Sequence, residues 1–140
     1  MKSLFIGAVL FSSAAFACPD ISGLYSCKYN SNTSTKEIVK TEQGFVINSD
    51  GNSMEYFADG KAYEVPSTDS YTDAKVRTTC TQNEMIVDFN ASILYDGSII
   101  AKQVSKSTYV MDGKDLIISQ KVKMKGIPLP AIKWTCVRNY

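Results

Sequence analysis

The chain of 140 residues contains no histidine. Histidine titrates nearest to neutral pH and activates the serine and cysteine nucleophiles of many hydrolases. Its absence removes those mechanisms and all imidazole metal ligands, which leaves carboxylates, lysine, tyrosine or a free thiol for catalysis. Glu84 and Asp88 share one face of an expected strand but lie about 13 Å apart at the usual rise per residue. Paired glycosidase carboxylates lie about 5–9.5 Å apart. This spacing does not exclude carboxylate pairs on different strands. The chain is nevertheless predicted not to be an enzyme and to need no cofactor.

The early apolar run is too short to span a bilayer. It covers residues 4–11, follows Lys2 and precedes Ala15-Phe16-Ala17, which supplies the small residues that signal peptidase needs. Residues 1–17 are therefore predicted to be a bacterial-type signal peptide, and the protein is expected to be periplasmic or secreted. Residues 18–140 fit a single domain. Membrane attachment is expected only if Cys18 is lipidated, and the preceding Ala-Phe-Ala departs from the usual Leu-small-small pattern.

Neither sign of charge dominates the chain. Removing Lys2 with the signal peptide leaves 14 basic and 14 acidic residues, and this balance argues against nucleic-acid binding. The basic residues concentrate between positions 102 and 138, where a stripe of lysines shares one strand face: Lys121, Lys123 and Lys125. The stripe has two interpretations. It binds an anionic partner, such as lipid phosphate, a cell-wall anion or an acidic protein, or it is a solvated face that keeps a strand soluble.

The four cysteines include no Cys-x-x-Cys pair, and without histidine a zinc site lacks its usual ligands. No metal site is expected. An even number of cysteines in an exported chain instead predicts two disulfides, for which three pairings exist. Of these we favour Cys27 with Cys136 and Cys18 with Cys80.

Helical periodicity is absent after residue 17. The chain consists of short alternating segments separated by turn residues, and Asp-Gly occurs at positions 50–51, 59–60, 96–97 and 112–113, where it suits hairpin turns. Residues 67–73 are expected to form a polar loop, residues 116–125 the clearest strand, and residues 126–130 a rigid connector. About eight to ten strands with short connections predict an all-β, antiparallel up-and-down meander.

The first and last segments of this meander are expected to pair. Strand side chains alternate between faces, so each end segment places three residues on one face: Tyr25, Cys27 and Tyr29 in the first, and Trp134, Cys136 and Arg138 in the last. If Cys27 lies opposite Cys136, the same antiparallel register places Tyr25 opposite Arg138 and Tyr29 opposite Trp134.

Gly23-Leu24-Tyr25 near the start and Arg138 near the end resemble the closure signature of lipocalin-like (calycin) β-barrels. Those proteins carry Gly-x-Trp on the first strand, and a late arginine packs across the tryptophan; here Tyr25 stands at the tryptophan position. The resemblance implies that the meander closes into a barrel, with Gly23, Tyr25 and Arg138 at the closure. It also implies a barrel that binds a small hydrophobic or amphipathic ligand.

The residues expected to face the interior, and thus to line a ligand site, are Tyr29, Phe45, Ile47, Tyr56, Met85, Val87, Phe89, Val122, Met124 and Trp134. A barrel of about eight strands is either filled by its own side chains or holds one small ligand, and both outcomes stay open. Gln103, Ser105 and Ser107 share one face of their strand, which is typical of a wetter cavity.

An alternative function is that of a protein-binding module, such as a small periplasmic lysozyme inhibitor. Tyr25-Ser26-Cys27 and the segment at residues 59–66 resemble parts of the small barrel that inhibits c-type lysozyme. The Ser-Gly-x-x-Tyr loop of that family is not matched, and Ser70-Tyr71 is its nearest counterpart. Its inhibitory residues are therefore not carried over. The leading prediction is an exported β-barrel that binds a lipid-like ligand.

Overall fold

The structure is a computed structural model that describes residues 18–139. The predicted signal peptide, residues 1–17, and Tyr140 lie outside the described residues. The strands are β1 (Gly23–Tyr29), β2 (Asn32–Lys40), β3 (Gly44–Ser49), β4 (Asn52–Phe57), β5 (Ala62–Val65), β6 (Tyr71–Cys80), β7 (Glu84–Tyr95), β8 (Ser98–Asp112), β9 (Asp115–Met124), β10 (Ile127–Pro128) and β11 (Ile132–Arg138). Nowhere in residues 18–139 is there a helix long and apolar enough to cross a membrane.

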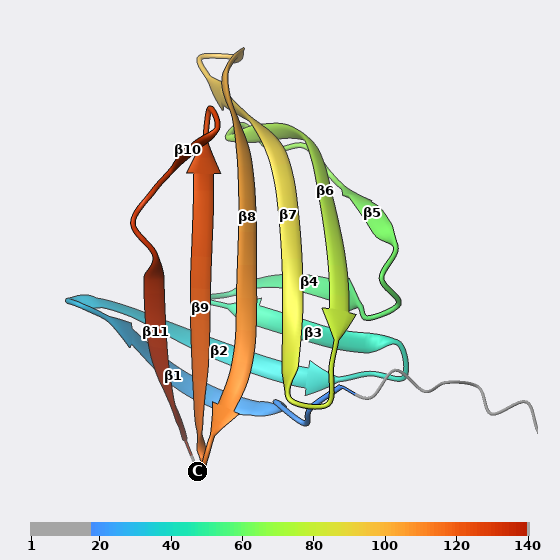
Figure 1. Cartoon of the computed structure of the whole chain (residues 1–140), viewed down its shortest axis with the longest axis vertical. Coiled ribbons are helices and arrows are strands. Elements are labelled where there is room, and N and C mark those ends of the chain that lie inside the picture. The colour runs from blue at the N-terminus through green and yellow to red at the C-terminus, as the bar shows by residue number, and fades with distance from the viewer. Residues whose placement is uncertain (1–17, 140) are drawn as a thin grey trace, which may run out of the picture.

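These strands form one antiparallel sheet in the order β4-β3-β2-β1-β11-β9-β8-β7-β6-β5, with β10 beside β9. β1 to β4 run across the long strands β6 to β9, so the sheet curls into a half-barrel (Figure 1). The predicted all-β antiparallel meander is confirmed. The sheet's edge strands, β4 and β5, are consecutive in the chain, and Gly60 N–H in their connection donates to the Thr78 carbonyl oxygen at 3.0 Å. Strand pairing therefore runs around the half-barrel without joining β4 to β5.

The first and last strands pair in the predicted register. Cys27 lies opposite Cys136, and Tyr25 lies opposite Arg138. The ring centroids of Tyr29 and Trp134, two positions beyond the paired cysteines, are 5.7 Å apart. Because strand alternation fixes which residues share a face, the paired cysteines were enough to predict the register of the whole ladder.

Both predicted disulfides are present, between Cys27 and Cys136 and between Cys18 and Cys80. They link residues 109 and 62 positions apart, respectively. Closing loops of these lengths in the unfolded chain stabilises the fold by about 4 kcal/mol each in the chain-entropy account. The bond to Cys80 also occupies the Cys18 sulfur, so a thioether-linked lipid on that atom is incompatible with this disulfide.

Tight turns join the consecutive strands of the meander. Asp50-Gly51 and Asp96-Gly97 have positive φ at both residues, as type I′ hairpin turns require, and their predicted role is confirmed. After Asp112 the positive φ falls on Gly113 alone. A further turn, Lys125-Gly126, also has positive φ at both residues, and it ends β9 one residue before the predicted end of that strand.

The hydrophobic core lies between β1–β3 and β6–β9 and contains Ile21, Tyr25, Cys27, Ile38, Phe45, Ile47, Val76, Met85, Val87, Tyr109, Leu116, Ile118 and Cys136. We call the end that holds this core, the Cys18–Cys80 disulfide and the β8–β9 turn the closed end. The end that holds the β7–β8 hairpin and β10 is the open end (Figure 1). Near the closed end, the start of β3 has no room for a side chain at Gly44. A Cβ atom there would lie 1.9 Å from the Tyr56 carbonyl oxygen on β4.

Candidate ligand-binding face

The concave inner face of the half-barrel changes in burial along its strands. On β9, Leu116 and Ile118 are fully buried, whereas Val122 and Met124 on the same face are partly exposed. On β8, Tyr109 is buried, and the inward residues nearer the open end are partly exposed. The long strands β6 to β9 extend beyond β1–β4 toward the open end (Figure 1). At the open end, β1–β4 therefore cover less of the inner face of the long strands.

The ten residues predicted to line a ligand site divide into two groups by burial. Four are packed in the core, with exposed fractions of 0–6%: Phe45, Ile47, Met85 and Val87. The other six are partly exposed: Tyr29, Tyr56, Phe89, Val122, Met124 and Trp134. We call these six the open inner face. Three of the six, Tyr56, Phe89 and Trp134, also pack against the core. The filled interior thus continues into a partly exposed apolar surface on the concave side.

Aromatic contacts and uncharged polar groups occur together on the open inner face. The Tyr71 ring meets Phe89 edge-on with centroids 5.6 Å apart, an arrangement that aromatic quadrupoles favour. Ser105 Oγ donates to the Phe89 carbonyl oxygen at 3.4 Å. Gln120 Nε2 donates to Ser107 Oγ at 3.4 Å. The surface therefore combines rings and aliphatic groups with a few hydroxyl and amide groups, a composition typical of sites for amphipathic molecules.

Tyr71 is a contributor that the sequence interpretation missed, because it was assigned to the polar loop at residues 67–73. It is the first residue of β6, and the register between β6 and β7 shifts between Thr72 and Lys75. This bulge breaks the alternation that would have identified the strand. The aromatic residue within an otherwise polar segment was the available signal.

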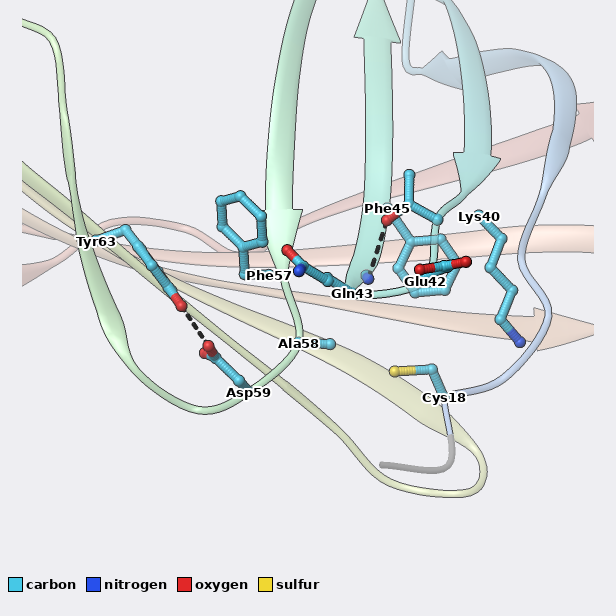
Figure 2. A pocket seen from close by; sticks show the side chains of 11 residues that line it. Cys18, Lys40, Glu42, Gln43, Phe45, Phe57, Ala58, Asp59 and Tyr63 are labelled. Carbon is cyan, nitrogen blue, oxygen red and sulfur yellow. Dashed lines mark hydrogen bonds between the residues drawn. The ribbon is translucent and has the colours of Figure 1, made fainter. Parts of the chain in front are cut away.

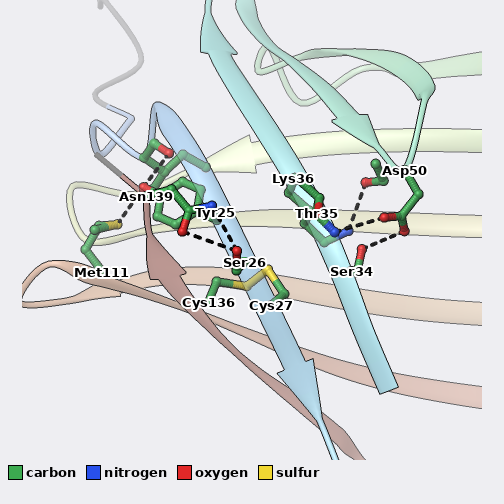
Figure 3. Close-up of a disulfide and its surroundings, with 12 residues drawn as sticks. Tyr25, Ser26, Cys27, Ser34, Thr35, Lys36, Asp50, Met111, Cys136 and Asn139 are labelled. Atoms are coloured by element: carbon green, nitrogen blue, oxygen red, sulfur yellow. Dashed lines mark hydrogen bonds between the residues drawn. A yellow bond between two sulfur atoms is a disulfide. The ribbon is translucent and has the colours of Figure 1, made fainter. Parts of the chain in front are cut away.

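Charge on the inner face is restricted to cations. Among the described inward positions of β1–β4, β7–β9 and β11, none carries a carboxylate. Lys36 is half-buried, and its Nζ donates to Ser49 Oγ at 2.9 Å. Burial lowers the pKa of Lys36, and the nearby Asp50 carboxylate opposes that shift. Asp50 accepts from Thr35 N–H and Ser34 Oγ, which hold its pKa below the usual range (Figure 3).

Two phenols in this region, those of Tyr56 and Tyr109, have raised pKa values. Burial raises the pKa of Tyr56, and the neighbouring Tyr71 adds to the shift. Burial likewise raises the pKa of Tyr109 well above its ordinary value, with a smaller contribution from Tyr56.

The structure brings together the three predicted closure residues, Gly23, Tyr25 and Arg138. Arg138 Nη2 donates to Tyr25 Oη at 2.9 Å, and its guanidinium carbon lies 5.5 Å from the centre of the tyrosine ring. Tyr25 Oη donates in turn to the Ile21 carbonyl oxygen at 3.0 Å. Gly23 has φ +153°, and a Cβ atom there would lie 3.2 Å from both Arg138 Nε and the Tyr25 ring. This cluster joins the first and last strands at the closed end.

A separate cleft opens beside the ends of β3 and β4 (Figure 2). It encloses about 410 Å³ and is lined by Cys18, Lys40, Thr41, Glu42, Gln43, Gly44, Phe45, Phe57, Ala58, Asp59 and Tyr63. Tyr63 Oη donates to the Asp59 carboxylate, and Lys61 N–H donates to it at 2.9 Å; these bonds hold the pKa of Asp59 low. The cleft is open to solvent, carries both signs of charge, and takes Asp59 and Tyr63 from the segment at residues 59–66.

Comparison of the chain with models of protein families, with curated proteins and with solved structures finds no similar protein. A functional assignment therefore depends on the geometry and chemistry of the chain itself.

Proposed function

We propose that the protein binds a small hydrophobic or amphipathic molecule, lipid-like in character, on the open inner face. One observation carries the proposal: six apolar and aromatic side chains on a concave surface stay partly exposed beside a filled core. Covering about 200 Å² of such surface contributes on the order of 5 kcal/mol before the cost of association. Because the closed end is packed, the ligand would lie along the inner face.

The absence of inward carboxylates and the presence of Lys36 support a neutral or anionic ligand over a cationic one. A cation would meet a half-buried ammonium and find no counter-charge among the inward strand positions described above. The hydroxyl and amide groups of Ser105, Ser107 and Gln120 would satisfy a polar group on a mainly apolar molecule.

The experiment is a titration of delipidated, oxidised protein with palmitate below its critical micelle concentration. Trp134 is the only tryptophan and belongs to the open inner face, so its emission reports occupancy directly. We expect a saturable blue shift with one ligand per chain, and native mass spectrometry should detect the same stoichiometry.

A matched pair of variants locates the site. Val122 faces inward on β9, and Val104 faces outward on the neighbouring strand β8. Val122→Glu should weaken palmitate binding more than tenfold, because it places a carboxylate against an apolar, anionic ligand, whereas Val104→Glu should leave binding unchanged. Equal effects of the two variants, or no saturable binding by the wild type, would contradict the proposal.

The second candidate is a protein-binding module, which the cleft beside the ends of β3 and β4 favours. A peptide loop would meet apolar side chains, Lys40 and the Asp59 carboxylate there. The test is inhibition of a c-type lysozyme by the oxidised protein, with Lys40→Ala as the cleft variant. No inhibition at high molar excess would remove this candidate, and the palmitate titration would be unaffected by that result.

A further inference from the structure

The open end exposes an unusual concentration of large apolar side chains. Five of them have exposed fractions between 45% and 68%: Tyr95, Ile99 and Ile100 in the β7–β8 hairpin, and Ile127 and Leu129 in the connection from β9 to β11. Single exposed apolar residues are ordinary on a soluble protein, but a cluster at one end marks an interaction surface.

The two segments are neighbours. Lys125 N–H, at the β9–β10 turn, donates to the carbonyl oxygen of Lys102 on β8 at 3.1 Å. Ile127 pairs with Met124, and Leu129 N–H donates to the Val122 carbonyl oxygen at 2.8 Å. Both segments project at the same end of the sheet, beyond the core (Figure 1). We call the five exposed apolar residues the apolar tips.

Lysines surround the apolar tips on the β8–β10 side. Lys102, Lys123 and Lys125 are exposed within a few residues of the tips. Further down the outer face, Lys106 lies directly opposite Lys121. Like charges in that position destabilise a sheet, while Asp88 lies opposite Lys106 on the β7 side.

Carboxylates occur at this end as well, but most lie on other elements. Asp96 is in the β7–β8 turn itself, while Asp69 and Asp73 lie in or near the β5–β6 connection. The side formed by β8, β9 and β10 is therefore basic. The predicted lysine stripe contributes two outward residues on β9, Lys121 and Lys123, and one residue in the turn, Lys125.

We propose that the open end docks on the surface of an anionic lipid bilayer. The apolar tips enter the boundary between headgroups and acyl chains, and the lysines contact lipid phosphates. A soluble polyanion would neutralise the lysines but leave five large apolar side chains in water, so the combination favours a bilayer. The inference does not depend on the ligand proposal, although docking at this end would bring the open inner face close to lipid.

Sedimentation with vesicles tests the proposal on oxidised mature protein, residues 18–140. We expect binding to phosphatidylcholine vesicles that contain 30% phosphatidylglycerol and little binding to phosphatidylcholine alone. Raising the ionic strength from 0.1 to 1 M shortens the Debye length from about 10 to 3 Å and should weaken binding more than tenfold. Lys123→Gln with Lys125→Gln should weaken binding about 25-fold, at roughly fivefold per lysine near the surface.

Matched variants separate insertion from charge attraction. Ile127→Ser should weaken binding roughly tenfold, because it removes an inserted side chain. Val137→Ser replaces a comparably exposed side chain on β11 near the closed end and should have no effect. Lys28→Gln on β1 is the corresponding charge control. Circular dichroism of each variant checks that the fold is retained.

Three results would overturn the proposal. The first is an absence of binding to anionic vesicles at low salt. The second is an equal loss in Ile127→Ser and Val137→Ser. The third is a loss in the lysine variant without any loss in Ile127→Ser, together with equal binding to a soluble polyanion such as polyglutamate; this would assign the lysines to an acidic polymer.

Discussion

The closed end and the open end of the half-barrel differ in what their inward side chains do. At the closed end, inward residues such as Leu116 and Met85 are fully buried, and a disulfide and the Tyr25–Arg138 contact tie the ends of the chain together. At the open end, inward residues of the same chemical type, such as Met124, stay partly exposed. The same strands pass through both regions, so sheet structure alone does not account for the contrast.

The difference follows from how the two parts of the sheet cross. Where β1–β3 pack against β6–β9, apolar side chains from both meet and exclude water. Where the long strands extend past the crossing, the same alternation presents apolar groups to solvent. Burial at the closed end stabilises the fold, and the open end retains surface that a partner or ligand can cover. Substitutions should therefore affect stability at one end and binding at the other.

The largest effect on stability should come from removing the disulfide that joins the first and last strands. Replacing Cys27 and Cys136 together by alanine should lower the free energy of unfolding by about 4–5 kcal/mol, because the bond spans 109 residues. Urea denaturation under oxidising conditions measures the change. Replacing Cys18 and Cys80 together should cost slightly less, since the loop is shorter. A loss below 1 kcal/mol for both pairs would show that the closed end is held by packing alone.

Two positions on β9 sharpen the comparison within one strand. Leu116→Ala removes a fully buried side chain and should destabilise the protein by about 2–5 kcal/mol. Met124→Ala, on the same face at the open end, should cost less than about 1 kcal/mol and instead weaken palmitate binding. Urea midpoints and the Trp134 titration measure the two quantities. Equal destabilisation by both variants would mean that the core continues to the open end.

Alkaline pH should lower the free energy of unfolding through Tyr109, which is buried at the closed end. Burial raises the pKa of its phenol, so above pH 10 the unfolded chain loses this proton while the folded chain keeps it. The stabilisation is complete below pH 10 and is lost as the pH rises further, by up to about 1.4 kcal/mol per pH unit. Unfolding at pH 8 and pH 11 measures the slope, and Tyr109→Phe should reduce it. An unchanged slope in that variant would assign the effect to other groups.

The sequence was informative about the closed end because strong local signals converge there. The alternation around Cys27 and Cys136 predicted both the pairing of the end strands and their register. Three of the four Asp-Gly pairs correctly predicted hairpin turns, and the Asp50 and Asp96 turns have the expected positive φ. The prediction for Asp59-Gly60 was wrong, because that pair connects β4 to β5, the two edge strands, which do not pair with each other. Each of these features depends on a few neighbouring residues, and the disulfide adds a covalent constraint.

The open end was harder to predict, since alternation assigns a side chain to a face but not to a depth. Met85 and Phe89 lie on the same face of β7, yet one is buried and the other partly exposed. Which of them is covered depends on where distant strands cross, and no local pattern encodes that. The bulge before Lys75 and the Lys125-Gly126 turn also interrupt the regular pattern. The ten predicted lining residues were therefore assigned to one site, although they occupy two environments.

The smallest expected effect on stability concerns Thr78, where β6 contacts the β4–β5 connection. Thr78 is 1% exposed, and within residues 18–139 its side-chain hydroxyl has no hydrogen-bond partner. A buried, unpaired hydroxyl costs free energy that a methyl group of similar size does not. Thr78→Val should therefore raise the free energy of unfolding by about 1 kcal/mol. The bond from Gly60 N–H to the Thr78 carbonyl should persist, because it uses the backbone.

Thr79→Val, at the adjacent outward and only half-buried position, should change stability much less in the same urea titration. Destabilisation by Thr78→Val would mean that the hydroxyl has a hydrogen-bond partner, such as a bound water, and that a polar side-chain contact stabilises this part of β6.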